Sequence, residues 1–221
     1  MLLQGQVGQI TATDGAQNTL RVGRTGEFIG TQAHARYYEQ TSRGNIFSLV
    51  QLASVSAIAA GNLLNAAANA ATQYAIWNPV GSGVNLALMR VTVGVISATT
   101  LPAGPPFHGL FLYGNPTNNS TFDSGRGAYN NLANGKAPVA RYINTATTGT
   151  TITGGTAPVA FRAMNTTFNA AAFASAAGTS MTEFVEGDII IPPGYGWLPL
   201  WNTAGSAALP SYSVTWEEVP I

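Results

Sequence analysis

Alternation of apolar and polar residues is clearest in the middle of the chain. Residues 84–97 read Val-Asn-Leu-Ala-Leu-Met-Arg-Val-Thr-Val-Gly-Val-Ile-Ser, and their second half is rich in β-branched side chains. Successive side chains of a strand point to opposite faces, so this pattern predicts one long strand with a buried face. Segments of similar character predict further strands at 73–77, 108–113, 139–143, 150–153, 159–164, 182–185, 189–191, 197–201 and 211–218.

Turns rich in glycine and proline separate these segments. Clear examples are Gly81-Ser82-Gly83, residues 101–106 and Pro192-Pro193-Gly194. Counting gives eight or nine short strands, and no segment supplies the strand–helix–strand rhythm of a parallel sheet. The chain is therefore predicted to be all-β, an antiparallel β-sandwich of the jelly-roll type.

Two segments differ from this pattern. Residues 1–45 hold seven of the 18 charged residues in a polar stretch punctuated by glycine, where 31–44 could form a short helix. We interpret 1–45 as an extended N-terminal arm that lies on neighbouring subunits, with a flexible tail as the alternative, and 46–221 as the sandwich domain. The segment 53–71 is rich in Ala, Asn and Ser, which leaves both a helix and an edge strand open.

Charge is scarce along the whole chain. Nine basic and nine acidic residues among 221 give a net charge of zero, and Lys136 is the only lysine. An ordinary soluble domain carries about a quarter charged residues. Because a neutral surface favours self-association, the composition suits a subunit that is largely covered in a permanent assembly. The arginines are scattered, which argues against a nucleic-acid partner.

The sequence offers no membrane segment and no cysteine chemistry. The most apolar window, 49–71, is interrupted by Gln, Ser, Gly and Asn, whereas a membrane-spanning helix needs about 20 apolar residues. The absence of cysteine excludes disulfides and thiolate metal sites. No membrane partner is therefore expected.

Catalytic and metal-binding patterns are also missing. His34 and His108 lie 74 residues apart without a second ligand at metal-site spacing, so both are predicted to be structural. Asp188 is interpreted as the cap of a turn, and Glu217 and Glu218 as pointing to opposite faces of a strand. A nucleophile elbow and a phosphate loop are absent. We predict no enzyme, no metal and no cofactor.

Four aromatic residues near the C-terminus allow two interpretations. Trp197 and Trp201 are an even number of residues apart and so share one face of a strand, as do Tyr212 and Trp216. Such a set could form a glycan-binding platform. Large aromatics also fill the cores of sandwiches, and core filling is the favoured interpretation.

The order of several sequence blocks resembles the order found in a known group of proteins. The blocks are 36–39 (Arg-Tyr-Tyr-Glu), 43–48 (Arg-Gly-Asn-Ile-Phe-Ser), 77–86, 189–194 (Ile-Ile-Ile-Pro-Pro-Gly) and 214–220 (Val-Thr-Trp-Glu-Glu-Val-Pro). With them the chain resembles a group of tailed-bacteriophage virion structural proteins. The resemblance implies a homotrimeric decoration (cement) protein of jelly-roll type on the outer capsid surface, with the major capsid protein as its partner.

The resemblance also implies which part would grip the shell. In such proteins an N-terminal arm holds the capsid, so we expect shell contacts from Arg21, Arg24, Arg36, Tyr37, Tyr38 and Arg43. A tail-associated, glycan-reading receptor-binding protein is the alternative, for which the aromatic platform would be the site. A single-jelly-roll major coat protein fits less well because genome packing needs a more basic interior face.

Overall fold

The computed structural model describes residues 5–6, 20–21, 35–51, 57–98, 102, 104–113, 122, 124–125, 128–132, 136–145, 149–164, 179–203 and 208–221. The chain divides into two compact units, Met1–Glu39 and Gln40–Ile221. The first unit contains a short parallel pair, β1 (Gly5–Gln6) with β2 (Leu20–Arg21). Helix α1 (Tyr38–Ser42) spans the division. Of the predicted 31–44 helix the structure describes 35–44, and only 38–42 are helical.

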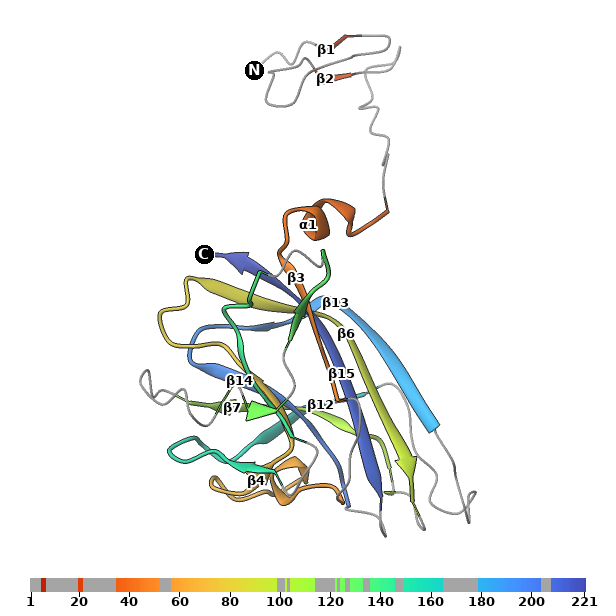
Figure 1. Ribbon diagram of the computed structural model, residues 1–221, viewed down its shortest axis with the longest axis vertical. Coiled ribbons are helices and arrows are strands. Elements are labelled where there is room, and N and C mark those ends of the chain that lie inside the picture. The colour runs from red at the N-terminus through yellow and green to blue at the C-terminus, as the bar shows by residue number, and fades with distance from the viewer. Residues whose placement is uncertain are drawn as a thin grey trace. The chain divides into compact units, whose positions relative to one another are not determined.

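The second unit is built from two main sheets (Figure 1). One has five strands in the order β13 (Thr179–Ile191), β6 (Val84–Ser97), β15 (Leu209–Pro220), β3 (Ile46–Val50) and β9 (Tyr129–Asn130). The other has six strands in the order β12 (Val159–Ala163), β7 (Phe107–Leu112), β14 (Tyr195–Leu200), β5 (Tyr74–Trp77), β10 (Arg141–Asn144) and β8 (Ser124–Gly125). A small sheet pairs β11 (Thr150–Thr151) with β4 (Ala71–Thr72).

All neighbours in the two main sheets are antiparallel except β8 and β10. The predicted all-β, antiparallel sandwich is therefore confirmed. Along the chain, β3, β6, β13 and β15 belong to the five-stranded sheet, and β5, β7, β12 and β14 belong to the six-stranded sheet. The spatial orders β13-β6-β15-β3 and β12-β7-β14-β5 match the double Greek key of a jelly roll.

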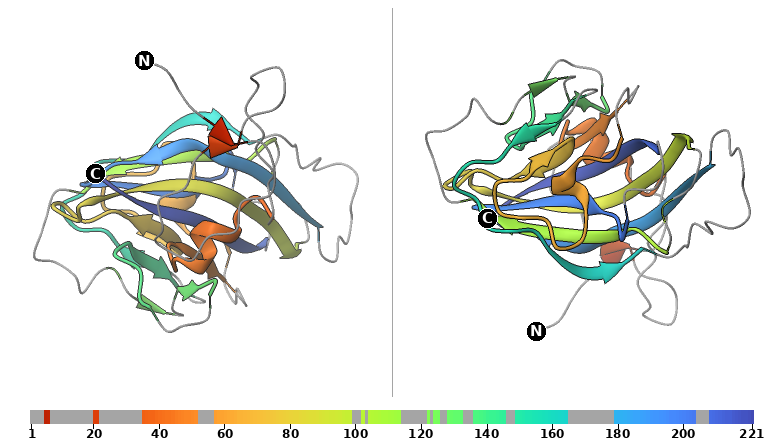
Figure 2. Two further views of the ribbon diagram at one scale, coloured as in Figure 1. Left: turned by 90° about the horizontal axis from the view of Figure 1, so that it is seen from above. Right: turned by 90° about the horizontal axis from the view of Figure 1, so that it is seen from below.

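The main core lies between the two sheets (Figure 2). Strand β6 contributes Val91, Val93 and Val95 at alternate positions, as its sequence pattern predicts. Aromatic side chains from both sheets fill the remaining space, and Tyr74 of β5 packs against Tyr212 of β15 with ring centroids 5.1 Å apart. Apolar side chains facing inward from both sheets are the main stabilising feature of the sandwich.

A second apolar cluster lies on the outer face of the six-stranded sheet. Trp77, Phe111 and Leu198 belong to it, and Ile152 from a connecting segment covers them together with Leu64. Residues 196–200 of β14 are therefore all buried, although a strand with one wet face would alternate. The middle of the six-stranded sheet, at β5 and β14, is therefore buried on both faces, whereas Val159 and Phe161 of the edge strand β12 are exposed.

The segment 53–71 forms part of this cover. It contains the 3₁₀ helix η1 (Ala60–Asn62) and leads into β4, while 52–56 lies outside the described residues. The side chain of Asn62 is fully buried and bonds three backbone groups: it donates to the carbonyls of Tyr74 and Pro199 and accepts from the N–H of Gln73. Side-chain hydrogen bonds of this kind replace a continuous helix or strand here.

The chain from 182 to 191 forms one strand where the sequence predicted two. Strand β13 continues through an irregularity at which Glu186 and Gly187 have φ of 54° and 89°. A bulge of this kind keeps a long strand paired while shifting its register. The expectation that Asp188 caps a turn is wrong, because Asp188 lies within β13 and its carboxylate accepts a hydrogen bond from Arg162.

Candidate functional site

The structure places the predicted arm residues as follows. Arg36 lies over the ring of Tyr37, with its guanidinium carbon 5.3 Å from the ring centroid, which is a cation–π contact. Tyr38 begins α1 and is about half exposed, and Arg43 is exposed just after the helix. The side chain of Arg21, all of Arg24 and the predicted structural histidine His34 lie outside the described residues.

The hypothesis of a glycan platform is wrong. Trp197, Trp201 and Trp216 are 0% exposed and Tyr212 is 2% exposed, and all four belong to the core between the sheets. The indole of Trp201 donates a hydrogen bond of 2.9 Å to the hydroxyl of Tyr212. Even spacing placed these side chains correctly on common faces, but those faces point inward. The favoured core interpretation holds for these four residues, which therefore cannot form a glycan-binding platform.

The described residues form neither a candidate metal site nor a membrane-spanning helix. None of their His, Asp and Glu side chains gather in threes that could hold a metal ion. No helix in the described part of the chain is long and apolar enough to cross a membrane. We therefore infer function from the exposed surfaces of the sandwich.

The outer face of the five-stranded sheet differs from that of the other sheet. Register pairs side chains across it in rows: Phe184, Arg90, Thr215 and Ser48 form one, and Thr182, Thr92, Ser213 and Val50 form the next. A third row contains Ile190, Ala87 and Glu217. Residues directly opposite in antiparallel strands lie on the same face. We call these three rows the sheet face.

The sheet face is exposed and apolar at its β13 edge, partly buried towards β15, where Thr215 is 6% exposed, and nearly uncharged. Phe184 is 69% exposed and Ile190 is 55% exposed, whereas the intervening Val185 is buried. Arg90 and Glu217 are the only charged residues of the three rows. Hydroxyls bond one another across strands, with 2.9 Å between Thr92 and Thr182. Such a combination of exposed large apolar groups and few charges is typical of a protein contact surface.

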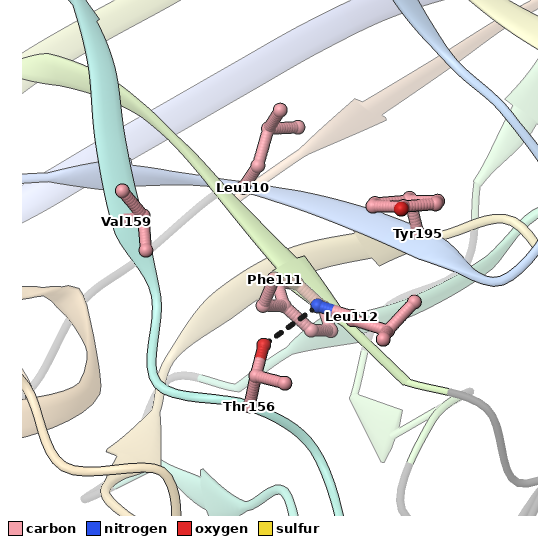
Figure 3. A pocket seen from close by; sticks show the side chains of 6 residues that line it. All are labelled: Leu110, Phe111, Leu112, Thr156, Val159 and Tyr195. Atoms are coloured by element: carbon pink, nitrogen blue, oxygen red, sulfur yellow. Dashed lines mark hydrogen bonds between the residues drawn. The ribbon is translucent and has the colours of Figure 1, made fainter.

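A shallow apolar hollow lies beside β12, at the edge of the six-stranded sheet. It has a volume of about 220 Å³ and is lined by Leu110, Phe111, Leu112, Thr156, Val159 and Tyr195 (Figure 3). The hydroxyl of Thr156 accepts a hydrogen bond of 2.9 Å from the N–H of Leu112, so the one polar side-chain group apart from the tyrosine hydroxyl is already engaged. We call this region the edge hollow. It offers an apolar surface with no charged group among its lining residues.

A polar cluster lies between the edges of the two sheets and runs from the buried His108 to the exposed Asp188. The fully buried imidazole of His108 is 3.1 Å from Glu183 through Nε2, and it accepts a hydrogen bond of 3.1 Å from the indole of Trp197 at Nδ1. The second carboxylate oxygen of Glu183 accepts a 2.7 Å hydrogen bond from Arg162, which also bonds Asp188. We call these five residues the His108 cluster.

Titration of His108 is disfavoured by its surroundings. Burial lowers the pKa of His108 below its ordinary value of 6.5, while the hydrogen bond to Glu183 opposes the shift and the charge of Arg162 supports it. Both ring nitrogens are occupied by protein groups, and the ring has no exposure to solvent. A general acid or base needs to reach a substrate, so His108 serves the structure, as the sequence predicted.

The sequence does not predict the sheet face, because the pattern of β13 is misleading. In β13 the charged Glu183 and the apolar Val185 point inward, and the apolar Phe184 between them points outward. Simple alternation would place Phe184 in the core, because a charged residue is normally on the wet face. The only sequence signal for a contact surface is the low number of charged residues, and it does not indicate where that surface lies.

Comparison with known protein families, with curated proteins and with solved structures finds no match to this chain. The evidence for the function of this chain is therefore the geometry of the sandwich and the order of its sequence blocks.

Proposed function

We propose that this chain is a structural subunit of a tailed-phage virion, a decoration protein that binds the outer capsid surface as a homotrimer. The observation that carries the proposal is the sheet face, where Phe184 and Ile190 stand in solvent on a surface with two charges in three rows. Large apolar groups exposed on a surface with few charges are typical of a site that a partner covers. The order of sequence blocks indicates the virion as the setting.

A closed ring of copies could form through the sheet face of one copy and the edge hollow of the next. In a cyclic trimer each copy contacts its neighbours through two different patches, because the interface is heterologous. The sheet face and the edge hollow are two such patches on separate strands, and both lack repelling charge clusters. The near absence of formal charge across the chain removes the electrostatic penalty for bringing copies together.

The capsid contact is assigned to the first unit and α1. Arg36 and Tyr37 form a cation–π pair, with the guanidinium carbon of Arg36 5.3 Å from the ring centroid of Tyr37. Arg21, Arg24, Tyr38 and Arg43 complete the proposed contact set. Arginine and tyrosine are the residue types that dominate the energetics of protein interfaces.

The substitution Phe184→Glu is expected to disrupt the trimer without unfolding the subunit. A carboxylate at this position would have to be desolvated against a neighbouring copy, while in the free subunit it stays in water opposite Arg90. We expect the apparent dissociation constant of the trimer to rise by at least about 100-fold. Light scattering coupled to size-exclusion chromatography at several concentrations measures it.

Val80→Glu is the matched control for that experiment. Val80 is 48% exposed and lies in the turn between β5 and β6, away from the rows of the sheet face. It introduces the same charge, so it should leave the trimer intact. A wild-type chain that stays monomeric, or a Phe184→Glu variant that stays trimeric, would show that the sheet face is not the contact.

Capsid binding is tested with purified shells that lack the protein. We expect the wild-type chain to sediment with the shells and a variant with Arg21, Arg24, Arg36 and Arg43 changed to Gln to remain in the supernatant. Arg141→Gln in β10 is the control for the loss of a basic residue elsewhere. Equal binding of all three proteins would contradict the assigned contact set, and no binding of the wild type would contradict the capsid proposal.

A further inference from the structure

The two sheets approach each other at their free edges, β12 on one side and β13 on the other. There the His108 cluster connects four strands: β7 with His108, β14 with Trp197, β12 with Arg162 and β13 with Glu183 and Asp188. The first three strands belong to the six-stranded sheet and the last to the five-stranded sheet. A continuous chain of hydrogen bonds therefore joins the sheets at this edge.

The direction of these hydrogen bonds fixes the protonation state of the imidazole. An indole N–H is only a donor, so Nδ1 of His108, 3.1 Å from Trp197, has to be the acceptor. A neutral imidazole then carries its proton on Nε2, which donates to Glu183 at 3.1 Å. The cluster holds one tautomer of a neutral histidine between a donor and an acceptor.

A second proton has no favourable place in this arrangement. It would have to bind Nδ1, and an N–H at that nitrogen would face the N–H of Trp197. Trp197 is fully buried, so its indole cannot turn to water for another acceptor. A buried donor without a partner costs about 1–3 kcal/mol. Glu183 would gain a charged partner, but its other oxygen is already held by Arg162, 2.7 Å away.

We propose that the His108 cluster is an acid-sensitive latch, in which protonation of His108 breaks its contact with Trp197 and loosens β12 from β13. Neutral His108 closes the latch, and the added proton opens it at the edge between the sheets. The trigger acts within one subunit, so the inference does not depend on the proposed assembly.

The sign of the pH effect follows from the position of the titration. The pKa of His108 is lowered in the folded chain relative to its ordinary value of 6.5. The stability that neutral His108 contributes is therefore fully present above pH 6.5 and is lost as the pH falls from there through the lowered pKa. Burial raises the pKa of Glu218, so protonation of that carboxyl acts in the opposite direction at low pH.

Hydrogen exchange of the full chain tests the latch. Protection factors, which correct for the pH dependence of chemical exchange, are compared at pH 7.5 and pH 5.0 for the amides of 159–163 and 179–185. If opening restores the ordinary pKa of 6.5, these factors fall by up to about 30-fold, while those of 74–77 change less. Unchanged protection in β12 and β13, or an equal loss in 74–77, would overturn the proposal.

His108→Gln is the matched control. A glutamine amide offers an acceptor for the indole of Trp197 and a donor for Glu183, but it does not titrate in this range. We expect the selective loss of protection in β12 and β13 to disappear in this variant, while the effect of Glu218 remains. The same acid-dependent loss in His108→Gln would exclude His108 as the trigger.

Trp197→Phe provides an independent readout if His108→Gln does not fold. It removes the opposing N–H and keeps an aromatic ring in the core. Nitrogen-15 NMR of the two imidazoles, assigned with a His34→Gln variant, should show the Nε2–H tautomer of His108 in the wild type. The His108 titration should move to higher pH in Trp197→Phe. An Nδ1–H tautomer, or a titration unchanged by this substitution, would contradict the latch.

Discussion

Replacing Trp201 with alanine is expected to lower the free energy of unfolding by about 3–5 kcal/mol. The side chain is 0% exposed in the core between the sheets, and its indole N–H bonds the Tyr212 hydroxyl at 2.9 Å. Alanine would leave a cavity and a buried hydroxyl without its donor. Urea-induced unfolding followed by circular dichroism measures the change, provided that the transition is two-state.

Tyr195→Ala is the comparison that separates the core from the surface. Tyr195 is 41% exposed beside the edge hollow, so its removal should cost less than about 1 kcal/mol. A glycan platform residue would behave in the same mild way. Similar small losses for Trp201→Ala and Tyr195→Ala would therefore contradict the burial of Trp201.

Asn62→Ala is expected to have an effect of similar size from a single polar side chain. It would remove three hydrogen bonds, at 3.2 Å to the Tyr74 carbonyl, 3.0 Å to the Pro199 carbonyl and 2.9 Å from the Gln73 N–H. Each buried backbone group left without a partner costs about 1–3 kcal/mol, so we expect a loss of at least about 3 kcal/mol. The same unfolding measurement applies.

The neighbouring Asn69→Ala is the control for this substitution. Asn69 is exposed and lies in the same Ala- and Asn-rich segment, so alanine there should change stability by less than about 0.5 kcal/mol. If Asn62→Ala were equally mild, the loops would not depend on Asn62 to cover the six-stranded sheet.

The strands that sequence could predict are those with one buried face. Residues 84–97 alternate because β6 has the core on one side and an open face on the other. Strand β14 carries no alternation, since residues 196–200 are buried on both faces, and only its aromatic content indicated a strand. Strand β3 (Ile46–Val50) was missed because its five residues follow directly on the polar 1–45 segment.

The candidate site was harder to predict because its signals are long-range. Nothing near Glu183 in the sequence indicates that Arg162 will pair with its charge and that His108 will donate a hydrogen bond to it. The inward direction of Glu183 and the outward direction of Phe184 therefore cannot be inferred locally. Asn62 gave no signal either, since it is one of several asparagines in 53–71 and differs from Asn69 only in what surrounds it. Local pattern identifies faces, and tertiary contacts decide which face is wet.

The outer faces of the two sheets differ in how far loops cover them, and this difference limits how copies of the chain can stack. The outer face of the six-stranded sheet is covered around β5 and β14 by the chain's own 57–72 and 149–158 segments, whereas the sheet face has no such cover at its β13 edge. A subunit with one exposed apolar face and one face covered by its own loops cannot bind a further copy on both faces. Stacking face on face therefore ends at two copies, and a larger assembly has to use a second patch such as the edge hollow, where closure of the ring is what prevents a fibre.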